Sequence, residues 1–434
     1  MKGNAYIPFM RSRGDGSTLN LDFTGGSLDP RVVLTRSAAT ATYINSSGYV
    51  ASAAVNEARF DYDPTTLAAK GLLIEGEAIN YMLRSTTLNP HSVTGMRTIS
   101  TASITDPEGT TNKASIIAAD ATASYHARFL GTIAGTNTTI TVSIFAKKNG
   151  YKYLYFADFA NGRSAVRFDL DDGTTSNSAG GGFVSASATS YSNGWWRCSM
   201  VVTVTASTSY SWSYVGLPTS GATLNAYGAV YNGTNTDSDG IYAYGFQVEG
   251  GTGASSYIPT VASQTTRNPD LALMTSTNFS SWFTGGTTGT FFVDWHGGVR
   301  GITSTVRSVI STNDQTTKHL HLQQVSAAGV LKVADFGAAH SVSTANSITS
   351  GARTKGAFNF DGATTTVNLC LNGGTVATSS AIAFSVAPTW LVLGGTSTDG
   401  STLTDLTTVL NGSIRQIKYY PTALTSAQLI AMTT

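Results

Sequence analysis

Charged side chains are scarce in this chain. Asp, Glu, Lys and Arg make up 12% of the 434 residues, about half of the ~25% that is usual in globular proteins. The formal net charge is +1, and Lys147-Lys148 is too short to form a basic stripe, so we do not expect nucleic acid as a partner. Ser, Thr, Gly and Asn take the place of the missing charges. A surface of hydroxyl and amide groups suits an extracellular or particle-surface protein better than a cytosolic enzyme.

Long apolar runs are missing as well. No run approaches the ~20 residues that cross a bilayer, so we expect no membrane partner. The first ten residues, MKGNAYIPFM, lack the apolar core of a signal peptide. If the protein works outside a cell, we expect it to leave by lysis or on a particle rather than by classical secretion.

Cysteine is limited to Cys198 and Cys370, each of which lies in an apolar strand pattern of a different predicted domain. A disulfide would have to join two domain cores, which is geometrically awkward. We therefore predict two buried free thiols. Two thiols and six scattered histidines are too few to predict a zinc site, and no cofactor is expected except a structural calcium ion.

Glutamate is absent after Gly250. A glycoside hydrolase needs two carboxylates, ~5–5.5 Å apart if retaining and ~6.5–9.5 Å apart if inverting. The missing Glu argues against such an enzyme in the C-terminal part, and no catalytic residue is predicted anywhere. Glu75 and Glu77 share one face of a predicted strand, and we interpret them as a solvated face rather than as a catalytic pair. We expect a protein that is not an enzyme.

What the chain does contain is alternation of apolar and polar residues, broken at short intervals by Gly, Asn, Asp and Ser. This pattern predicts an all-β protein built of antiparallel β-sandwiches. Asn-Gly and Asp-Gly pairs supply the turns. The predicted strands of the first series are 139–147, 151–158, 164–169, 195–205, 210–215 and 241–249.

A second series of strands begins near residue 289. Its predicted strands are 290–295, 307–311, 319–324, 330–336, 357–361, 366–371, 390–394 and 412–420. The sequence of residues 425–432 predicts a helix, the only one expected in the chain, with Thr425 or Ser426 as its N-cap. The Gly-, Ser- and Thr-rich stretch 251–269, with Pro259 and Pro269, predicts a linker.

Aromatic residues alternate along two of the predicted strands. Pyranose rings stack on exposed aromatic faces, so these residues are candidates for a glycan-binding platform. The alternatives are that the rings fill the space between two sheets or contact a neighbouring subunit. The candidates are Tyr151, Tyr153, Tyr155, Trp196, Trp212 and Tyr214.

Several motifs together resemble a family of bacteriophage virion proteins, usually described as tail-fibre-like or structural. The resemblance keeps its order from about residue 20 to the C-terminus. It is carried by Leu21-Asp22-Phe23, Leu28-Asp29-Pro30-Arg31, Thr35-Arg36, Ala41-Thr42-Tyr43, Arg59-Phe60-Asp61-Tyr62-Asp63-Pro64, Lys70-Gly71-Leu72-Leu73-Ile74-Glu75, Asn193-Gly194-Trp195-Trp196-Arg197-Cys198, Tyr244-Gly245-Phe246-Gln247-Val248-Glu249, Ser256-Tyr257-Ile258-Pro259-Thr260, Gly412-Ser413-Ile414-Arg415 and Tyr419-Tyr420-Pro421.

This resemblance implies a carbohydrate-binding-module-like jelly roll over residues 66–250 and a concanavalin A-like (laminin-G-like) sandwich with a short C-terminal helix over residues 270–434. Residues 1–65 are expected to form an extended arm that attaches the protein to other virion proteins. Jelly-roll modules often hold a structural Ca²⁺ through aspartates, although plain turns explain the same residues. The candidate ligands are Asp169, Asp171, Asp172, Asp237 and Asp239.

The resemblance also implies a role. We expect a fibre- or spike-type component at the virion surface that contacts a host glycan and forms a symmetric homo-oligomer, with a trimer favoured. One alternative is a capsid decoration or head-fibre protein of the same fold, in which glycan binding is incidental. A second alternative is a polysaccharide depolymerase.

Overall fold

The structure is a computed structural model. It describes residues 14–37, 41–88, 92–97, 100–134, 138–158, 164–178, 181–191, 193–204, 209–218, 223–225, 228–298, 306–313, 320–325, 330–334, 341–349, 351–380, 388–397, 399, 401–403 and 405–434. The chain divides into two compact units, which are described separately. Unit 1 comprises Met1–Leu34, Leu271–Gly297 and Thr305–Thr434, and unit 2 comprises Thr35–Asp270 and Gly298–Ser304.

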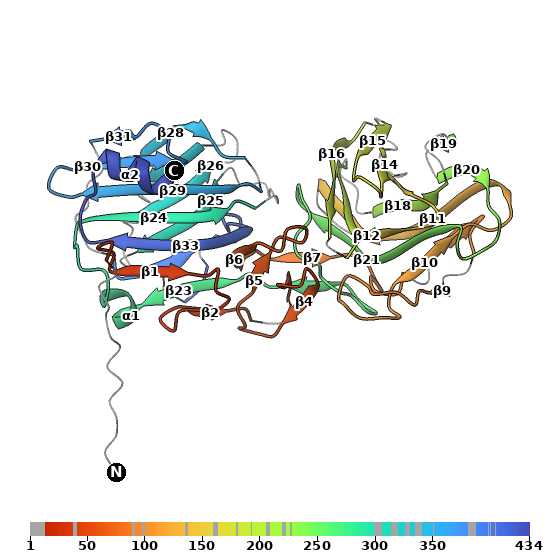
Figure 1. Cartoon of the computed structure of the whole chain (residues 1–434), viewed down its shortest axis with the longest axis horizontal. Coiled ribbons are helices and arrows are strands. Elements are labelled where there is room, and N and C mark those ends of the chain that lie inside the picture. The colour runs from red at the N-terminus through yellow and green to blue at the C-terminus, as the bar shows by residue number, and fades with distance from the viewer. Residues whose placement is uncertain are drawn as a thin grey trace, which may run out of the picture. The chain divides into compact units, whose positions relative to one another are not determined.

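Unit 1 is a β-sandwich assembled from both ends of the chain. Its first sheet has the strand order β31-β30-β29-β24-β33, and β1 lies antiparallel beside β33 (Figure 1). These strands are β1 (Leu19–Asp22), β24 (Thr288–His296), β29 (Arg353–Asp361), β30 (Thr366–Leu371), β31 (Ala377–Ser379) and β33 (Gly412–Tyr420). The N-terminal strand therefore completes a sheet whose other strands come from the last third of the chain.

The second sheet of unit 1 contains the order β23-β32-β25-β26-β27-β28. Its strands are β23 (Leu271–Thr275), β25 (Val306–Asn313), β26 (His321–Val325), β27 (Val330–Ala334), β28 (Ser341–Ser347) and β32 (Trp390–Leu393), and β2 (Val33–Thr35) lies at the boundary between the units. The two sheets pack closely, because a Cβ added to Gly356 of β29 would come within 2.8 Å of Leu331 of β27. The core is thus formed by the facing sides of two sheets.

Unit 1 also carries the two helices. The helix α2 (Ser426–Thr433) begins at the N-cap Thr425, whose side chain accepts a hydrogen bond from the Gln428 amide in a capping box. Leu429 is buried against the outer face of the first sheet, beside Phe292 and Cys370. The predicted C-terminal helix is confirmed. The short helix α1 (Ser276–Ser280) was not predicted, since five residues offer no helical period to recognise.

Unit 2 is a second sandwich. One sheet has six strands in the order β16-β17-β12-β21-β10-β9. They are β9 (Ser100–Thr101), β10 (Ser115–Ala118), β12 (Thr139–Asn149), β16 (Phe183–Ser190), β17 (Trp196–Thr203) and β21 (Gly240–Gly250). The opposing sheet has the order β15-β14-β13-β18-β11-β20-β19, with β8 also beside β11. They are β8 (Ser92–Thr94), β11 (Ala123–Ala134), β13 (Tyr153–Asp158), β14 (Ala165–Asp169), β15 (Thr175–Ser178), β18 (Ser209–Leu217), β19 (Thr223–Asn225) and β20 (Gly228–Asn232).

The six-stranded sheet is covered on both faces. One face packs against the opposing sheet, where Ile144, Phe156 and Phe246 lie in the main core. The other face holds a separate aromatic cluster that includes Phe145, Trp195, Tyr244 and Tyr257. Short strand pairs complete the unit. They are β3 (Ala41–Ile44) with β4 (Val50–Ala53), β5 (Phe60–Tyr62) with β6 (Ala69–Ile74), and β7 (Ala78–Asn80) with β22 (Thr265–Arg267).

The predicted all-β fold with antiparallel sandwiches is confirmed, and the alternation of side chains on successive strands explains why the pattern was readable. The domain boundaries differ from those predicted. The predicted arm 1–65 supplies β1 to unit 1 and β3, β4 and β5 to unit 2, while residues 1–13 lie outside the described residues. The predicted linker 251–269 is built into unit 2, because Ser255, Tyr257, Ile258 and Arg267 are buried. Backbone and side-chain hydrogen bonds over long sequence distances decide this, and a linear pattern does not show them.

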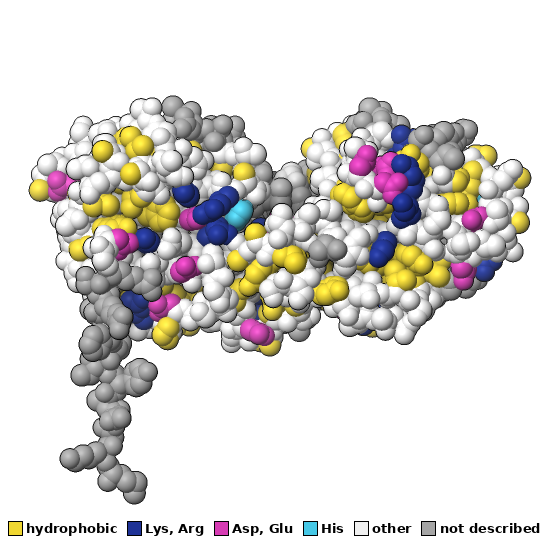
Figure 2. All heavy atoms as spheres, viewed as in Figure 1, with side chains coloured by type: hydrophobic (Ala, Val, Ile, Leu, Met, Phe, Trp, Pro, Cys, Tyr) yellow, Lys and Arg dark blue, Asp and Glu magenta, His cyan; other side chains and the backbone are white. Residues whose placement is uncertain are grey.

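The surface agrees with the composition. On the face drawn in Figure 2, charged side chains occur in a few small groups, and most of the surface is neither charged nor hydrophobic. In the described part of the chain, no helix is long and apolar enough to span a membrane.

Candidate functional site

A pocket opens in unit 2 beside the edge of the six-stranded sheet, near β9, β10 and β21. Its volume is about 500 Å³, within the ~300–1,000 Å³ range of small-molecule sites. Hydroxyl groups dominate the lining, together with one carboxylate, one ammonium group and one amide. The lining residues are Thr86, Thr87, Thr101, Glu108, Asn112, Lys113, Ser115, Tyr244 and Pro259.

One wall of the pocket is the loop between β9 and β10. Asp106 is fully buried and organises this loop: its Oδ1 accepts hydrogen bonds from the amides of Glu108 (2.8 Å) and Thr110 (3.1 Å). Its Oδ2 accepts from the Thr110 hydroxyl at 2.6 Å. The indole Nε1 of Trp195 donates to the carbonyl of Thr105 at 2.9 Å. The loop is therefore held in place before any ligand arrives.

Glu108 is the central polar group of the pocket. Its Oε1 accepts a 2.6 Å hydrogen bond from the Tyr244 hydroxyl, and its Oε2 lies 2.6 Å from Lys113 Nζ. Burial, the neighbouring Tyr257 and the hydrogen bond to Glu108 raise the pKa of Tyr244 above its ordinary value. The hydrogen bond and the charge of Glu108 likewise raise the pKa of Lys113. Tyr244 thus remains an O–H donor and Lys113 remains a cation at neutral pH.

A second wall of the pocket is the turn that follows β7 and contains Thr86 and Thr87. The amides of Thr87 and Leu88 both donate to the carbonyl of Arg84. Ser115 Oγ reaches the Thr87 carbonyl at 3.3 Å and so ties this turn to β10. Ser115 stands directly opposite Thr101 in the β9–β10 register, which places these two side chains on the same face of the sheet.

Next to this wall, the segment that contains Pro259 is fixed by a buried hydroxyl network. Ser85 Oγ lies 2.8 Å from the Tyr257 hydroxyl and accepts from the Thr260 amide at 2.8 Å. Thr260 Oγ1 in turn donates to the Met82 carbonyl at 2.6 Å. Both walls are therefore supported by groups that lie behind the lining, a requirement for a binding site of fixed shape.

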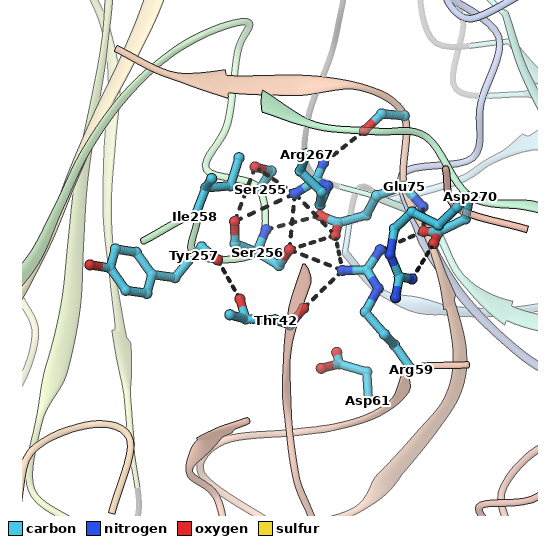
Figure 3. Close-up of polar contacts among 12 residues, drawn as sticks. Thr42, Arg59, Asp61, Glu75, Ser255, Ser256, Tyr257, Ile258, Arg267 and Asp270 are labelled. Carbon is cyan, nitrogen blue, oxygen red and sulfur yellow. Dashed lines mark hydrogen bonds and ion pairs between the residues drawn. The ribbon is translucent and has the colours of Figure 1, made fainter. Parts of the chain in front are cut away.

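A second cluster of polar residues in unit 2 is buried and has a different character (Figure 3). Glu75 accepts from Arg59 Nη1 (2.6 Å) and from the amide (2.9 Å) and hydroxyl (2.7 Å) of Ser256, and it lies 3.3 Å from Arg267 Nη1. Asp270 binds Arg59 Nη2 at 2.5 Å. We call this cluster, with Arg36 as its remaining arginine, the ionic network.

The ionic network is closed to solvent. The side chains of Arg36, Arg59, Arg267 and Asp270 have 0% exposure, and Glu75 has 6%. Burial alone would raise the pKa of Glu75, but Arg267, Arg59 and the Ser256 hydrogen bonds outweigh it and hold the pKa well below the ordinary value. These charges are paired with one another and have no access to solvent, so they offer no group to a ligand, and removing one partner would leave an uncompensated buried charge. Glu75 is therefore not on the solvated face that the sequence suggested.

The sequence pattern did not predict the ionic network, although four of its residues lie in motifs that the sequence analysis had singled out. Arg36, Arg59, Glu75 and Ser256 all lie in the motifs that carry the family resemblance, and they converge at this one place. In a chain with so few charges, charged residues inside family motifs are candidates for buried pairs.

The structure does not bring the predicted glycan-binding aromatics together on an exposed face. Tyr151, Tyr155, Trp212 and Tyr214 are buried in the main core of unit 2, so the alternative that the rings fill the space between the sheets holds for these four. The two remaining residues are half-buried at the edge of this core.

Those two residues are Tyr153 and Trp196. The Tyr153 ring is covered by Lys152 Nζ at 4.8 Å and Arg167 Cζ at 5.3 Å. Trp196 Nε1 donates to the Leu170 carbonyl at 2.7 Å, and the ring lies against Gly173. Alternation does not distinguish an exposed strand face from a buried one, and both faces of β13 are buried.

The predicted calcium ligands face other partners. Asp169 Oδ2 lies 2.8 Å from Lys152 Nζ, and Asp171 Oδ1 lies 2.5 Å from Lys148 Nζ. Asp172 Oδ1 caps the Thr174 amide at 2.8 Å.

In the second group, Asp237 Oδ1 pairs with Arg97 Nε at 3.1 Å, and Asp239 accepts from the Thr234 hydroxyl. Within the described residues, no group of three or more His, Cys, Asp or Glu side chains is arranged to hold a metal ion. The turn explanation accounts for the contacts of Asp172. Cys198 and Cys370 are both free and buried, as predicted.

Comparison with known proteins identifies no family. No family model matches the chain, and no curated protein matches it. Solved structures give partial matches. The CBM40 module of the Ruminococcus gnavus IT-sialidase, bound to alpha2,3 sialyllactose, is 21% identical and covers 34% of this chain and 83% of its own, with a TM-score of 0.27.

Two other solved structures match at a similar level. The NanB sialidase of Streptococcus pneumoniae is 11% identical and covers 34% of this chain and 24% of its own, with a TM-score of 0.28. The SAP-like pentraxin of Limulus polyphemus is 12% identical and covers 34% of this chain and 70% of its own, with a TM-score of 0.28. These partial matches are too weak to indicate a function.

Proposed function

We propose that this protein is a structural component of a bacteriophage virion surface that binds a host glycan in the pocket of unit 2. The observation that carries the binding proposal is the pocket of about 500 Å³ lined by Glu108, Lys113 and a set of hydroxyl side chains. The resemblance to virion proteins and the hydroxyl-rich, weakly charged surface support the virion part of the proposal.

The chemistry of the pocket suits a sugar. A sugar presents many hydroxyl groups, each of which donates one hydrogen bond and accepts others. Thr86, Thr87 and Thr101 offer groups of the same dual kind. Asn112 adds an amide that both donates and accepts. Pro259 provides an apolar surface for the C–H groups of a pyranose. Such a mixture of few charges and many neutral polar groups matches a neutral polar ligand.

The preorganisation of the pocket favours binding. Asp106 fixes the Glu108 loop through three hydrogen bonds, and Ser85 and Thr260 fix the segment on the other side. A weak ligand benefits most from a preorganised site, because binding then carries no entropic cost for ordering the loops and side chains of the site. A virion protein with several copies would add avidity to each weak contact.

The pocket favours binding over hydrolysis of the glycan. Hydrolysis with two acids needs a second carboxylate within ~5–10 Å that is free to act. In the described part of the chain, Glu108 is the one carboxylate that lines the pocket. Asp106, the nearest in sequence, is buried and engaged by the loop amides. These features support a non-catalytic role, in contrast to the depolymerase alternative.

A glycan array probed with the full chain tests the binding proposal. Thr101 is exposed on β9, so Thr101→Trp should block the pocket without disturbing a core. Val184, 49% exposed on β16 at the opposite edge of the same sheet, provides the control Val184→Trp. We expect the first substitution to abolish binding and the second to leave it unchanged, with equal melting temperatures.

Two results would contradict the proposal. Equal glycan binding by the wild type and Thr101→Trp would exclude this pocket. Release of reducing sugar from a bound polysaccharide would support the depolymerase alternative.

Immunogold labelling of intact particles with an antibody against the chain tests the virion assignment. Label on the tail would support the fibre role, and label on the capsid would support the decoration alternative.

A further inference from the structure

The two charged residues of the pocket lie at different depths. The Glu108 side chain is 21% exposed, whereas the Lys113 side chain is 46% exposed. Tyr244, which donates to Glu108, is fully buried behind the carboxylate. A ligand that enters the pocket therefore passes the ammonium group near the rim and meets the carboxylate further in.

Among the described residues, each carboxylate oxygen of Glu108 has one hydrogen-bond partner. Oε1 accepts a hydrogen bond from the Tyr244 hydroxyl, and Oε2 accepts one from Lys113 Nζ, each at 2.6 Å. A carboxylate has about four lone-pair sites, so each oxygen can accept a further hydrogen bond. Two neighbouring hydroxyl groups of one sugar ring can fill these two positions, one on each oxygen.

Lys113 can add to this recognition without selecting an anion. An ammonium group has three donors, and one of them is used by Glu108. The remaining donors suit a ring oxygen or a further hydroxyl. The Glu108–Lys113 pair has no net charge, so an acidic ligand gains no net attraction from it.

An acidic sugar meets a specific cost in this arrangement. Its carboxylate would enter next to Glu108, and like charges in a partly desolvated site repel each other. Among the described residues, the rest of the lining is uncharged and provides no second cation to offset this repulsion. A neutral sugar makes the same hydroxyl contacts without that cost.

We infer that the pocket selects uncharged sugars with adjacent free hydroxyl groups and discriminates against sugars that carry a carboxylate, with Glu108 as the residue that sets this specificity. The inference rests on the proposed glycan binding. It adds the chemical class of the ligand and the residue that discriminates.

The test uses the full chain and an array that pairs each hexose oligosaccharide with its uronic acid counterpart, such as glucose with glucuronic acid and galactose with galacturonic acid. We expect the wild type to prefer the neutral member of the bound pair. Charged hydrogen bonds of the Glu108 type correspond to about tenfold or more in affinity. Glu108→Gln should therefore weaken neutral-sugar binding by about tenfold. It should also reduce the difference in affinity between the neutral sugar and its uronic acid counterpart.

Lys113→Met provides the opposite change. It leaves the charge of Glu108 without its neighbouring cation, so the difference in affinity between the neutral and the acidic sugar should increase. Lys148→Met, at an exposed lysine that pairs with Asp171 outside the pocket lining, is the matched control and should change neither affinity. Melting curves confirm that all variants are folded.

The possible outcomes separate the two proposals. A preference for the uronic acids, or tighter neutral-sugar binding by Glu108→Gln, would overturn the specificity while leaving glycan binding in place. Binding of neutral sugars with equal affinity for Glu108→Gln and the wild type would also overturn it. The absence of binding to every carbohydrate on the array would overturn the proposed function, and the specificity with it.

Discussion

Arg36 and Asp270 form a fully buried ion pair, with 2.8 Å between Arg36 Nη1 and Asp270 Oδ1. Arg36 is the second residue and Asp270 the last residue of Thr35–Asp270, the long segment of unit 2. Glu75 makes two further contacts with Asp270: the Glu75 amide donates to Asp270 Oδ2, and the Glu75 carbonyl accepts from the Asp270 amide, both at 2.9 Å. The ionic network thus holds together the two ends of a segment of more than two hundred residues.

The first prediction concerns the stability that the ionic network provides. Arg59→Met should destabilise the protein by about 3–5 kcal/mol, because it leaves Glu75 and Asp270 buried with fewer compensating charges. Lys148→Met removes a pair in which both side chains are about half exposed and should cost less than about 1 kcal/mol. Urea unfolding followed by tryptophan fluorescence measures both values. Equal costs for the two variants would show that the network contributes no more than a surface pair.

The second prediction concerns acid pH. The pKa of Glu75 lies below its ordinary value of 4.5 in the folded protein, so Glu75 contributes stability above that value and loses it as the pH falls toward its folded pKa. The free energy of unfolding should therefore fall less steeply below about pH 5 in Glu75→Gln than in the wild type.

Asp61 provides a control of opposite sign for this pH dependence. Burial raises its pKa, against the opposing effects of Lys70 and the Ile44 amide, so its contribution to stability is present at low pH and is lost as the pH rises. Asp61→Asn should make the acid loss of stability steeper. A slope that is unchanged in both variants would contradict the assignment of these two carboxylates.

The third prediction concerns alkaline pH. Burial raises the pKa of Tyr155 to about 12, and burial is also the largest cause that raises the pKa of Tyr191 to about 12. Folding keeps these hydroxyls protonated, so stability is present below about pH 10 and is lost as the pH rises through the folded values. Absorbance at 295 nm should show only part of the 19 tyrosines ionising at pH 11 in the folded protein. In 6 M guanidinium all of them should ionise near pH 10, and the same behaviour in the folded protein would contradict the prediction.

The fourth prediction concerns a glycine beside the aromatic cluster. Gly245 has a φ of +65°, and an added Cβ would lie 2.9 Å from the Phe145 ring and 3.2 Å from Tyr257. Gly194 in the same unit has a φ of +79°, but its added Cβ would meet only Lys147 at 3.5 Å. Both alanine variants carry the cost of a left-handed backbone, about 1–2 kcal/mol.

Gly245→Ala should cost about 1–3 kcal/mol more than Gly194→Ala because of the clash with the two rings. Thermal unfolding of the two variants in parallel gives the difference. A loss of stability in Gly194→Ala that equals or exceeds the loss in Gly245→Ala would show that the ring contacts are not tight.

Much of the fold followed from the sequence. Alternation over 412–420 predicted β33 with both ends correct, and the predicted strand 139–147 lies within β12. Asn-Gly and Asp-Gly pairs marked real turns: Gly150, Gly173 and Gly194 all have a positive φ. These features are local, since strand alternation and turn chemistry depend on neighbouring residues. The same holds for the C-terminal helix, whose capping box spans Thr425 to Gln428.

The candidate site did not follow from the sequence. Alternation predicted that Tyr155 and Trp212 share faces with other aromatics, but it cannot tell a face that meets solvent from one that meets a second sheet. The pocket residues come from separate segments that contain Thr87, Glu108 and Tyr244. No local pattern joins them, because hydrogen bonds over long sequence separations set their positions.

The scarcity of charge and the alternating pattern determined by themselves that this is an all-β protein with a hydroxyl-rich surface. Only the tertiary structure decided that the N-terminal strand β1 belongs to unit 1 beside β33, and that the expected linker is part of unit 2. It also decided which charges are buried. The physical reason is that pairing between distant strands, and the neutralisation of charges such as Arg36 and Asp270, depend on which segments meet in space.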